Sequence, residues 1–211
     1  MRTQRPVVAV ALVLAGLILA GCGRGALQPT HADTRYRSFT GTAYASNGED
    51  FSLIVDTRAS RVAERQEFLP LVVAFLNKSD ERVAVFRESF VLETTDGTRL
   101  PAVAYTEFEE NYARQNMDIR ASRDFLDALN GRYPEPPFRY RELEFYPPRG
   151  SGTVPREDID LGNGELAVGF IYFRLPHQDA LDDYGNSRVL FTPGEDDTQY
   201  VIELQAYRTK K

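Results

Sequence analysis

The chain has 211 residues, which is enough for one ordinary domain and a small second one but not for a large multidomain assembly. Lys and Arg total 25 against 31 Asp and Glu, a formal net charge of -6 at pH 7. An acidic surface repels phosphate backbones, so this balance argues against nucleic-acid binding. With two histidines, one cysteine and no tryptophan, the chain cannot build a Cys/His zinc cluster or a disulfide framework.

The N-terminal residues are predicted to be a targeting segment. Residues 1–6 hold two arginines and no acid, and residues 7–19 are thirteen uncharged and almost wholly aliphatic residues. A membrane-spanning helix needs about 20 such residues, so this run is short for a span. A basic start before a short apolar core is typical of a secretory signal peptide. We therefore predict that residues 1–21 are cleaved from the mature protein.

The end of the apolar run, Leu19-Ala20-Gly21-Cys22, resembles the lipobox of bacterial lipoproteins. The resemblance implies cleavage before Cys22 and acylation of its sulfur, and two or three acyl chains on one residue anchor a protein stably to a membrane. The alternative is an ordinary signal peptide with a chance cysteine. In enterobacterial lipoproteins, the lack of Asp after the cysteine favours the outer membrane, facing the periplasm. In a Gram-negative host, Gly23 would therefore indicate that location.

Residues 22–35 are predicted to be the lipidated N-terminus and a tether, because they are polar, contain Gly and Pro and lack periodicity. From residue 36 to residue 211 the pattern predicts one all-β domain. Runs rich in β-branched and aromatic residues alternate with turn residues, which favours a β-sandwich. The predicted strands are residues 39–45, 51–57, 69–76, 82–86, 90–94, 98–104, 165–175, 188–192 and 199–206.

Two dipeptides that end in glycine and one apolar run make this prediction more specific. Asn47-Gly48 lies between two predicted strands and predicts a turn there. Asp96-Gly97 lies between two others, where residues that tolerate positive φ suit a tight hairpin. Residues 69–76 (LPLVVAFL) are almost continuously apolar. We therefore predict that this run is a central strand.

Residues 105–149 interrupt the β pattern and are predicted to be a helical and proline-rich insert. Thr106 and Glu109 have the spacing of a capping box. Ser122 is predicted to cap a second helix over residues 123–130, and Gly131 to end it. The prolines that follow are expected to keep the rest irregular, because proline cannot donate to a sheet ladder. These prolines are Pro134, Pro136, Pro137, Pro147 and Pro148.

A family resemblance supports the sandwich. Residues 69–100 (LPLVVAFLNKSDERVAVFRESFVLETTDGTRL) and the DLGNG…GFIYFRLP run ending at Pro176 resemble the telokin-like, immunoglobulin-like domains of bacterial secreted proteins. The resemblance covers about residues 68–176 in two blocks. It implies an immunoglobulin-like β-sandwich and brings no general catalytic residues. Asn163 and the long insert depart from the family's pattern.

Long loops between strands are often functional, so the insert is the predicted binding element. Tyr and Arg are common anchors of protein interfaces. The candidate binding residues are Tyr105, Phe108, Tyr112, Arg139, Tyr140 and Arg141. If the insert binds a protein partner or forms a sugar-stacking platform, these side chains would face outward. The alternative is that the rings pack the insert onto a face or edge of the sandwich.

Catalytic and metal-binding patterns are weak. His177 and Asp179 lack a nucleophile elbow such as G-x-S-x-G, and paired carboxylates such as Glu107 with Glu109 are expected by chance in a chain that is 27% charged. Calcium could use two Asp-rich loops, but neither has the EF-hand register. The loop residues are Asp179, Asp182, Asp183, Gly185, Asn186, Glu195, Asp196 and Asp197.

Together these patterns predict a lipoprotein of the cell envelope rather than an enzyme, with no cofactor and no metal. Its folded part is predicted to be a non-catalytic interaction or assembly module for an envelope protein partner. The alternative function is binding of cell-wall glycan or a small ligand by the aromatic insert. A hydrolase that uses the carboxylates ranks third.

Overall fold

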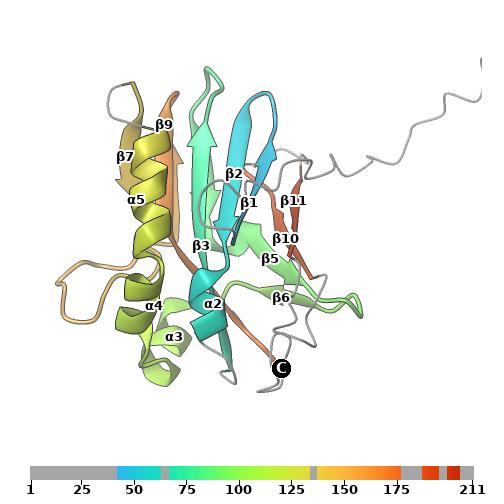
Figure 1. Ribbon diagram of the computed structural model, residues 1–211, viewed down its shortest axis with the longest axis vertical. Coiled ribbons are helices and arrows are strands. Elements are labelled where there is room, and N and C mark those ends of the chain that lie inside the picture. Colours follow the sequence, from blue (N-terminus) through green and yellow to red (C-terminus); the bar gives the residue numbers. More distant parts are fainter. Residues whose placement is uncertain (1–41, 63–66, 134–136, 177–186, 195–198, 205–211) are drawn as a thin grey trace, which may run out of the picture.

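The computed structural model describes residues 42–62, 67–133, 137–176, 187–194 and 199–204 (Figure 1). The predicted signal peptide, Cys22 and the tether lie outside these residues. Among the described helices, none is long and apolar enough to cross a membrane. The described part is rich in β-structure, as predicted, and its strands form two larger sheets and one strand pair.

The larger sheet has five strands in the order β1-β2-β3-β9-β7. Its neighbours are antiparallel, except that β7 runs parallel to β9. The strands are β1 (Ala43–Asn47), β2 (Phe51–Asp56), β3 (Phe68–Asn77), β7 (Arg139–Glu142) and β9 (Glu165–Arg174).

The second sheet has four antiparallel strands in the order β11-β10-β5-β6, and β4 pairs with β8 separately. These strands are β4 (Val83–Phe86), β5 (Phe90–Glu93), β6 (Arg99–Pro101), β8 (Asp158–Leu161), β10 (Arg188–Phe191) and β11 (Tyr200–Glu203). Between β4 and β5 lies the short 3₁₀ helix η1 (Arg87–Ser89).

Aromatic side chains join the two larger sheets. The ring of Phe75 on β3 lies 4.8 Å, between centroids, from that of Phe191 on β10, which stacks on Phe90 of β5 at 4.4 Å. Phe51 on β2 meets Tyr200 on β11 edge-on at 5.8 Å. Pairs of this geometry stabilise by about 0.5–1.5 kcal/mol beyond the area that they bury, so the sheets pack face to face through a specific core.

The opposite face of the five-stranded sheet is covered by helices (Figure 1). All ten residues of β3 are buried, because alternate side chains point to alternate faces. Leu71, Val73 and Phe75 join the core between the sheets, and Val72 and Ala74 pack with α5 residues. A strand buried on both faces reads as a continuous apolar run, so the prediction of a central strand at residues 69–76 is confirmed.

The helices are α2 (Arg58–Val62), α3 (Tyr105–Asn111), α4 (Gln115–Ala121) and α5 (Arg123–Arg132). The last three belong to the insert and follow one another along the sheet (Figure 1). On β9 the residues that face them are Leu166, Val168, Phe170 and Tyr172. The insert therefore covers one face of the five-stranded sheet, which was the alternative to an exposed binding element.

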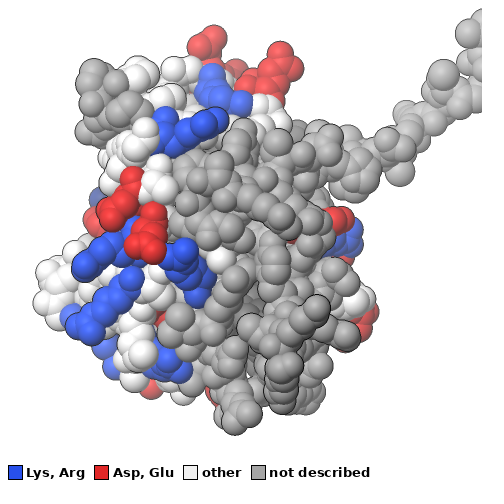
Figure 2. Space-filling model, in the orientation of Figure 1, with Lys and Arg blue, Asp and Glu red and all other residues white. Residues whose placement is uncertain are grey.

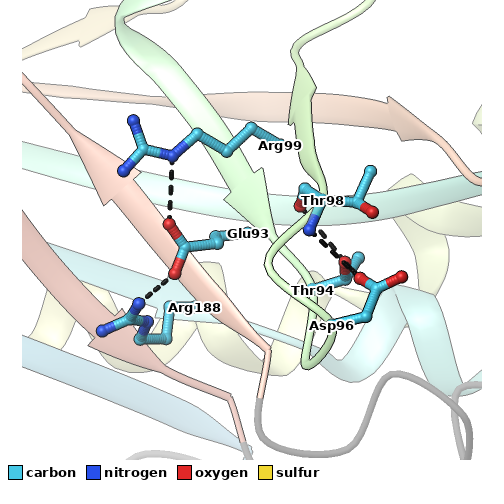
Figure 3. Close-up of polar contacts among 6 residues, drawn as sticks. All are labelled: Glu93, Thr94, Asp96, Thr98, Arg99 and Arg188. Carbon is cyan, nitrogen blue, oxygen red and sulfur yellow. Dashed lines mark hydrogen bonds and ion pairs between the residues drawn. The ribbon is translucent and has the colours of Figure 1, made fainter.

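Both predicted turns are confirmed. Gly97 has a φ of +84° and closes the β5–β6 hairpin, where Asp96 accepts hydrogen bonds from Thr94 and Thr98 (Figure 3). In the β1–β2 hairpin the Gly48 N–H donates to the Phe51 carbonyl at 2.8 Å, which puts residues 49 and 50 at the tip. A Cβ at position 48 would lie 2.9 Å from the ring of Tyr200, whose side chain would have to shift.

Polar contacts also tie the β5–β6 hairpin to the neighbouring strand. The Glu93 carboxylate accepts a hydrogen bond from Arg99 Nε at 3.0 Å and pairs with Arg188 on β10 (Figure 3). These contacts lower the pKa of Glu93 below its usual range, and the hydrogen bond with Arg188 has the largest effect. The contacts of Glu93 with Arg99 and Arg188 therefore link β5 to β6 and β10, three strands of the four-stranded sheet.

Three local predictions for the insert are wrong. Helix α3 begins at Tyr105 after Ala104 without a side-chain cap, so Thr106 lies inside the helix and no capping box forms. Ser122 does precede α5, but its hydroxyl makes no capping hydrogen bond, and Gly131 lies within α5 rather than ending it. These helices form without side-chain caps, and burial of an apolar face against the sheet stabilises them.

The proline-rich segment is not wholly irregular, because residues 139–142 form β7. No proline falls inside this strand, so its N–H groups can join the ladder. The Arg139 N–H donates to the Gly164 carbonyl at 3.1 Å, and the Leu143 N–H donates to that of Val168 at 2.8 Å. Strand β7 thereby forms one edge of the five-stranded sheet.

Candidate functional site

The insert carries all of the predicted binding residues, and the structure divides them between the interior and the surface. Phe108 is fully buried and Tyr112 is 2% exposed. Tyr105 and Tyr140 are half-buried, whereas Arg139 and Arg141 are exposed. The six residues therefore do not form one continuous aromatic face.

Phe108 and Tyr112 belong to an aromatic cluster that fixes the insert to β9. The ring of Phe108 lies 4.4 Å from that of Tyr172 and 5.0 Å from that of Tyr146, and the Tyr112 ring lies 5.2 Å from Tyr172. The Tyr146 hydroxyl donates to the Val103 carbonyl at 2.5 Å. A side chain with so little exposed surface cannot contact a partner while the insert is in place, so these rings serve packing.

A buried carboxylate lies at the centre of this cluster. Asp118 on α4 is 2% exposed, and its Oδ2 accepts hydrogen bonds from the hydroxyls of Tyr112 at 2.8 Å and Tyr172 at 3.2 Å. Burial raises the pKa of Asp118 to about 6. The two hydroxyl donors and nearby Arg114 act in the opposite direction and lower the pKa, but burial has the larger effect. Burial and the Asp118 charge raise the pKa of both tyrosines.

This arrangement accounts for the polar residues on the inner face of α4. Gln115 Nε2 donates to the Tyr146 carbonyl at 2.7 Å, one turn of helix from Asp118. Because the carboxylate is buried and already accepts from two tyrosines, it is suited to holding α3, α4 and β9 together. Sequence reasoning missed Asp118, since a single acid in a short helix gives no signal until its neighbours are known.

Tyr140 fixes the other end of the insert. Its hydroxyl lies 2.6 Å from the carbonyl oxygen of Tyr133, the residue that follows α5. It also lies 3.2 Å from the Leu129 carbonyl oxygen, which accepts from the Tyr133 N–H. Tyr105 lies at the start of α3, where its hydroxyl is 3.3 Å from Glu109 Oε1. Burial, followed by the Glu109 charge, raises the pKa of Tyr105.

Arg139 and Arg141 project from the edge strand β7. They lie two residues apart on one strand and so point to the same face, opposite to that of Tyr140. Arg141 Nη1 lies 3.8 Å from Glu165 Oε1 on β9, a long contact between an exposed guanidinium group and a largely buried carboxylate. These two guanidinium groups are the members of the predicted set that are placed to meet a partner.

The carboxylates considered for hydrolysis are engaged in surface contacts. Glu107 accepts from Arg174 at 2.8 Å, and Glu144 pairs with Arg156 at 3.1 Å. Ser151 lies in an exposed loop between two glycines of positive φ, not in a nucleophile elbow. His177 and the Asp-rich loops at 179–186 and 195–197 lie outside the described residues, and the described ones contain no group of acidic, His or Cys side chains suited to a metal ion.

Comparison with known proteins gives only remote likenesses. No family model and no curated protein matches the chain. It resembles the yjhA protein from Bacillus subtilis with a TM-score of 0.41 and 9% identity, over 76% of this chain and 96% of that one. It resembles a functionally unknown protein from Listeria monocytogenes EGD-e with a TM-score of 0.38 and 12% identity, over 78% and 82% of the two chains. Likenesses at this level carry no information about function.

Proposed function

We propose that this protein is a lipid-anchored protein of the bacterial cell envelope whose folded part is a non-catalytic protein-interaction module. The anchor is argued from the N-terminal sequence alone, in which a basic start and an apolar run lead to Leu19-Ala20-Gly21-Cys22. Acylation of Cys22 would hold the folded part near a membrane surface. In a Gram-negative host, the same sequence favours the periplasmic face of the outer membrane.

The interaction role rests on one observation: the insert packs its aromatic rings inward and leaves its arginines outside. Phe108 and Tyr112 fix it to β9, and Tyr140 closes α5. A surface held in one conformation loses little entropy when a partner binds, and arginine is enriched at protein interfaces. The exposed side of the insert, including Arg139 and Arg141, therefore suits docking.

We also propose that the two larger sheets constitute an immunoglobulin-like sandwich. Support comes from the antiparallel pairing within the four-stranded sheet and from the aromatic core between the sheets. The insert and the parallel strand β7 are additions to that plan. A role in glycan stacking has less support, because ring faces that stack on sugars must be accessible and those of Phe108 and Tyr112 are buried.

The anchor is tested by replacing the acylated residue. In cells that produce the full chain, Cys22→Ala should remove incorporation of a labelled fatty acid and shift the protein away from the lipoprotein fraction of the envelope. Cys22→Ser, which also lacks a thiol, should behave in the same way. Unchanged labelling of either variant would overturn the lipidation proposal.

The docking role is tested by photocrosslinking in cells from a residue on the exposed side of the insert. A photoreactive amino acid at Arg139 should give one dominant protein adduct. The same group at Thr98, which is exposed on the β5–β6 hairpin, is the matched control and should not give that adduct. Identical adduct patterns from both positions, or none from Arg139, would count against an interaction module.

A further inference from the structure

A cluster of cationic side chains lies on the outer surface of the insert, where α4 meets α5. Arg120 and Arg123 are exposed and Arg114 is half-buried. Met117 lies between them in sequence and is 46% exposed, one of two large apolar side chains of the described residues that stand out from the surface. We call Arg114, Met117, Arg120 and Arg123 the arginine patch.

Helical spacing brings the patch together. Arg114, Met117 and Arg120 follow one another at intervals of three, which places them on one side of α4. Asp118 is the only acidic residue of the stretch 114–123. It is buried toward Tyr112 and Tyr172, near enough to Arg114 for that charge to lower its pKa. The exposed charges of the stretch, on Arg120 and Arg123, are both positive.

The acids next to the two exposed arginines of the patch do not pair with them. Asp124, the next residue along the chain, pairs with Arg58 of α2, and neither Arg120 nor Arg123 forms an ion pair with another residue in the described ranges. Figure 2 shows Lys and Arg side chains gathered on the part of the surface that lies over α4 and the adjoining helices, with Asp and Glu side chains beside them. This local positive surface belongs to a chain with a net charge of -6.

We propose that the arginine patch is the docking site for an acidic segment of a partner protein, with an apolar side chain of that segment resting on Met117. This assignment rests on the proposed interaction function and names the part of the insert that performs it. Guanidinium groups bind carboxylates in a planar, two-pronged geometry that ammonium groups lack. The charges of the patch are all arginine, and Arg and Met are both enriched in protein interfaces while Lys is depleted.

The alternative occupant of a cationic surface is an anionic membrane. Segments that bind membranes through charge are typically runs of several Lys or Arg close to the anchor, whereas this patch holds three arginines far along the chain from Cys22. An acidic protein segment fits the number, type and spacing of these side chains better. Charge complementarity of this kind mainly governs specificity and the rate of association.

The test measures binding of a fluorescent peptide in which Glu alternates with Leu to the full chain purified in nonionic detergent. Fluorescence anisotropy should show saturable binding that weakens as salt is raised. The double variant Arg120→Glu/Arg123→Glu should raise the Kd about tenfold or more. The matched control Lys78→Glu/Arg82→Glu makes the same change of charge at two exposed residues between β3 and β4 and should leave the Kd within about twofold.

Three results would overturn the proposal. Equal weakening by both double variants would mean that only net charge matters, and equal binding of a peptide with Lys in place of Glu would exclude recognition of carboxylates. Displacement of the peptide by phosphatidylglycerol in the micelles, but not by phosphatidylcholine, would assign the patch to an anionic membrane. Each result leaves the crosslinking test from Arg139 unaffected, so this inference can fail while the interaction function stands.

Discussion

The carboxylate of Asp118 is almost completely buried. Its folded-state pKa of about 6 lies above the ordinary value of 3.8, so between these pH values the folded chain binds the proton more readily than the unfolded chain. The stability that this group contributes therefore rises as the pH falls through 6. At neutral pH the buried charge is stabilised by the hydroxyl donors of Tyr112 and Tyr172.

The first prediction follows from this sign. The free energy of unfolding should gain about 1 kcal/mol from Asp118 on going from pH 7 to pH 5, and Asp118→Asn should lack this gain because an amide does not titrate. Urea denaturation at the two pH values measures it. Asp127→Asn, an exposed acid on α5, is the control and should keep the wild-type difference. A full gain in Asp118→Asn would contradict the assignment.

Gly169 on β9 makes room for the chain that leaves β7. A Cβ at this position would lie 2.6 Å from Leu143 Cβ and 2.9 Å from the Leu143 carbonyl oxygen, and backbone atoms in a sheet cannot easily move away. Glycine is needed here because of the close approach. The contact holds the end of β7 against its parallel neighbour.

The second prediction compares two glycines. Gly169→Ala should lower the free energy of unfolding by about 1–3 kcal/mol, as overpacking of a core does. Gly131→Ala should raise it by about 0.4–1 kcal/mol, since that residue lies in α5 with nothing within 4 Å of an added Cβ and alanine favours helix. Thermal and urea unfolding monitored by circular dichroism measures both. Similar effects of the two changes would show that the contact with Leu143 is not limiting.

At the scale of elements, α5 is held to the sheet by a small apolar face. Phe125 and Leu129 are buried against Ile54, Val72 and Ala74, and the polar side chains of the helix face outward. Isolated helices of this length are marginal in water. The sheet therefore supplies the stability of α5, and α5 in turn covers apolar side chains of β2 and β3.

The third prediction is that Leu129→Ala lowers the free energy of unfolding by about 2–5 kcal/mol, because it leaves a cavity between helix and sheet. Its exposed neighbour in α5 is the control, and Asn130→Ala should change stability by no more than about 0.5 kcal/mol. The midpoints of urea denaturation give both values. Equal midpoints for the two variants would mean that α5 is not anchored through this face.

The strands of the sheets were largely predictable, because β-branched and aromatic runs bounded by turn residues mark them directly. Residues 69–76 gave the strongest signal, since burial on both faces leaves no polar alternation. Strand β8 was missed although Asp158–Leu161 alternates acidic and buried apolar residues. Its four residues are too short to stand out beside the turn that follows.

The insert was less predictable, because tertiary contacts rather than local signals decide its structure. A capping box at Thr106 and a stop at Gly131 were both expected and both are absent. The candidate binding set mixed buried and more exposed residues for the same reason. Tyr112 is buried and Tyr105 is half-buried, a difference between two tyrosines of one insert that only the folded structure reveals.

At the scale of the whole molecule, the insert is a structural layer. It covers a face of the five-stranded sheet that carries Val72, Leu76, Leu166 and other apolar side chains, and it supplies the edge strand β7. Without it, a broad apolar surface would face water, and surfaces of that kind lead to association. The sandwich and the insert are therefore expected to unfold together.

The fourth prediction is that replacing residues 105–149 by a short Gly-Ser linker abolishes cooperative folding. Near-ultraviolet circular dichroism and thermal unfolding of the full chain with this change should show no sharp transition. Deleting Ser151 and Gly152, which lie in an exposed loop, changes the chain length without uncovering the sheet and should preserve the transition. A cooperative transition in the chain that lacks the insert would show that the sandwich folds alone.

The pairing of β3 with β9 also affects when the five-stranded sheet can form during synthesis of the chain. Leu71 faces Ile171, so the central strand receives one of its two neighbours only after roughly a hundred further residues have been made, a sequence separation typical of slow folding. Until then β3 presents an apolar edge able to pair with another chain. Nascent molecules are therefore most prone to aggregate before residue 174 is available, and truncation between β7 and β9 should yield insoluble protein.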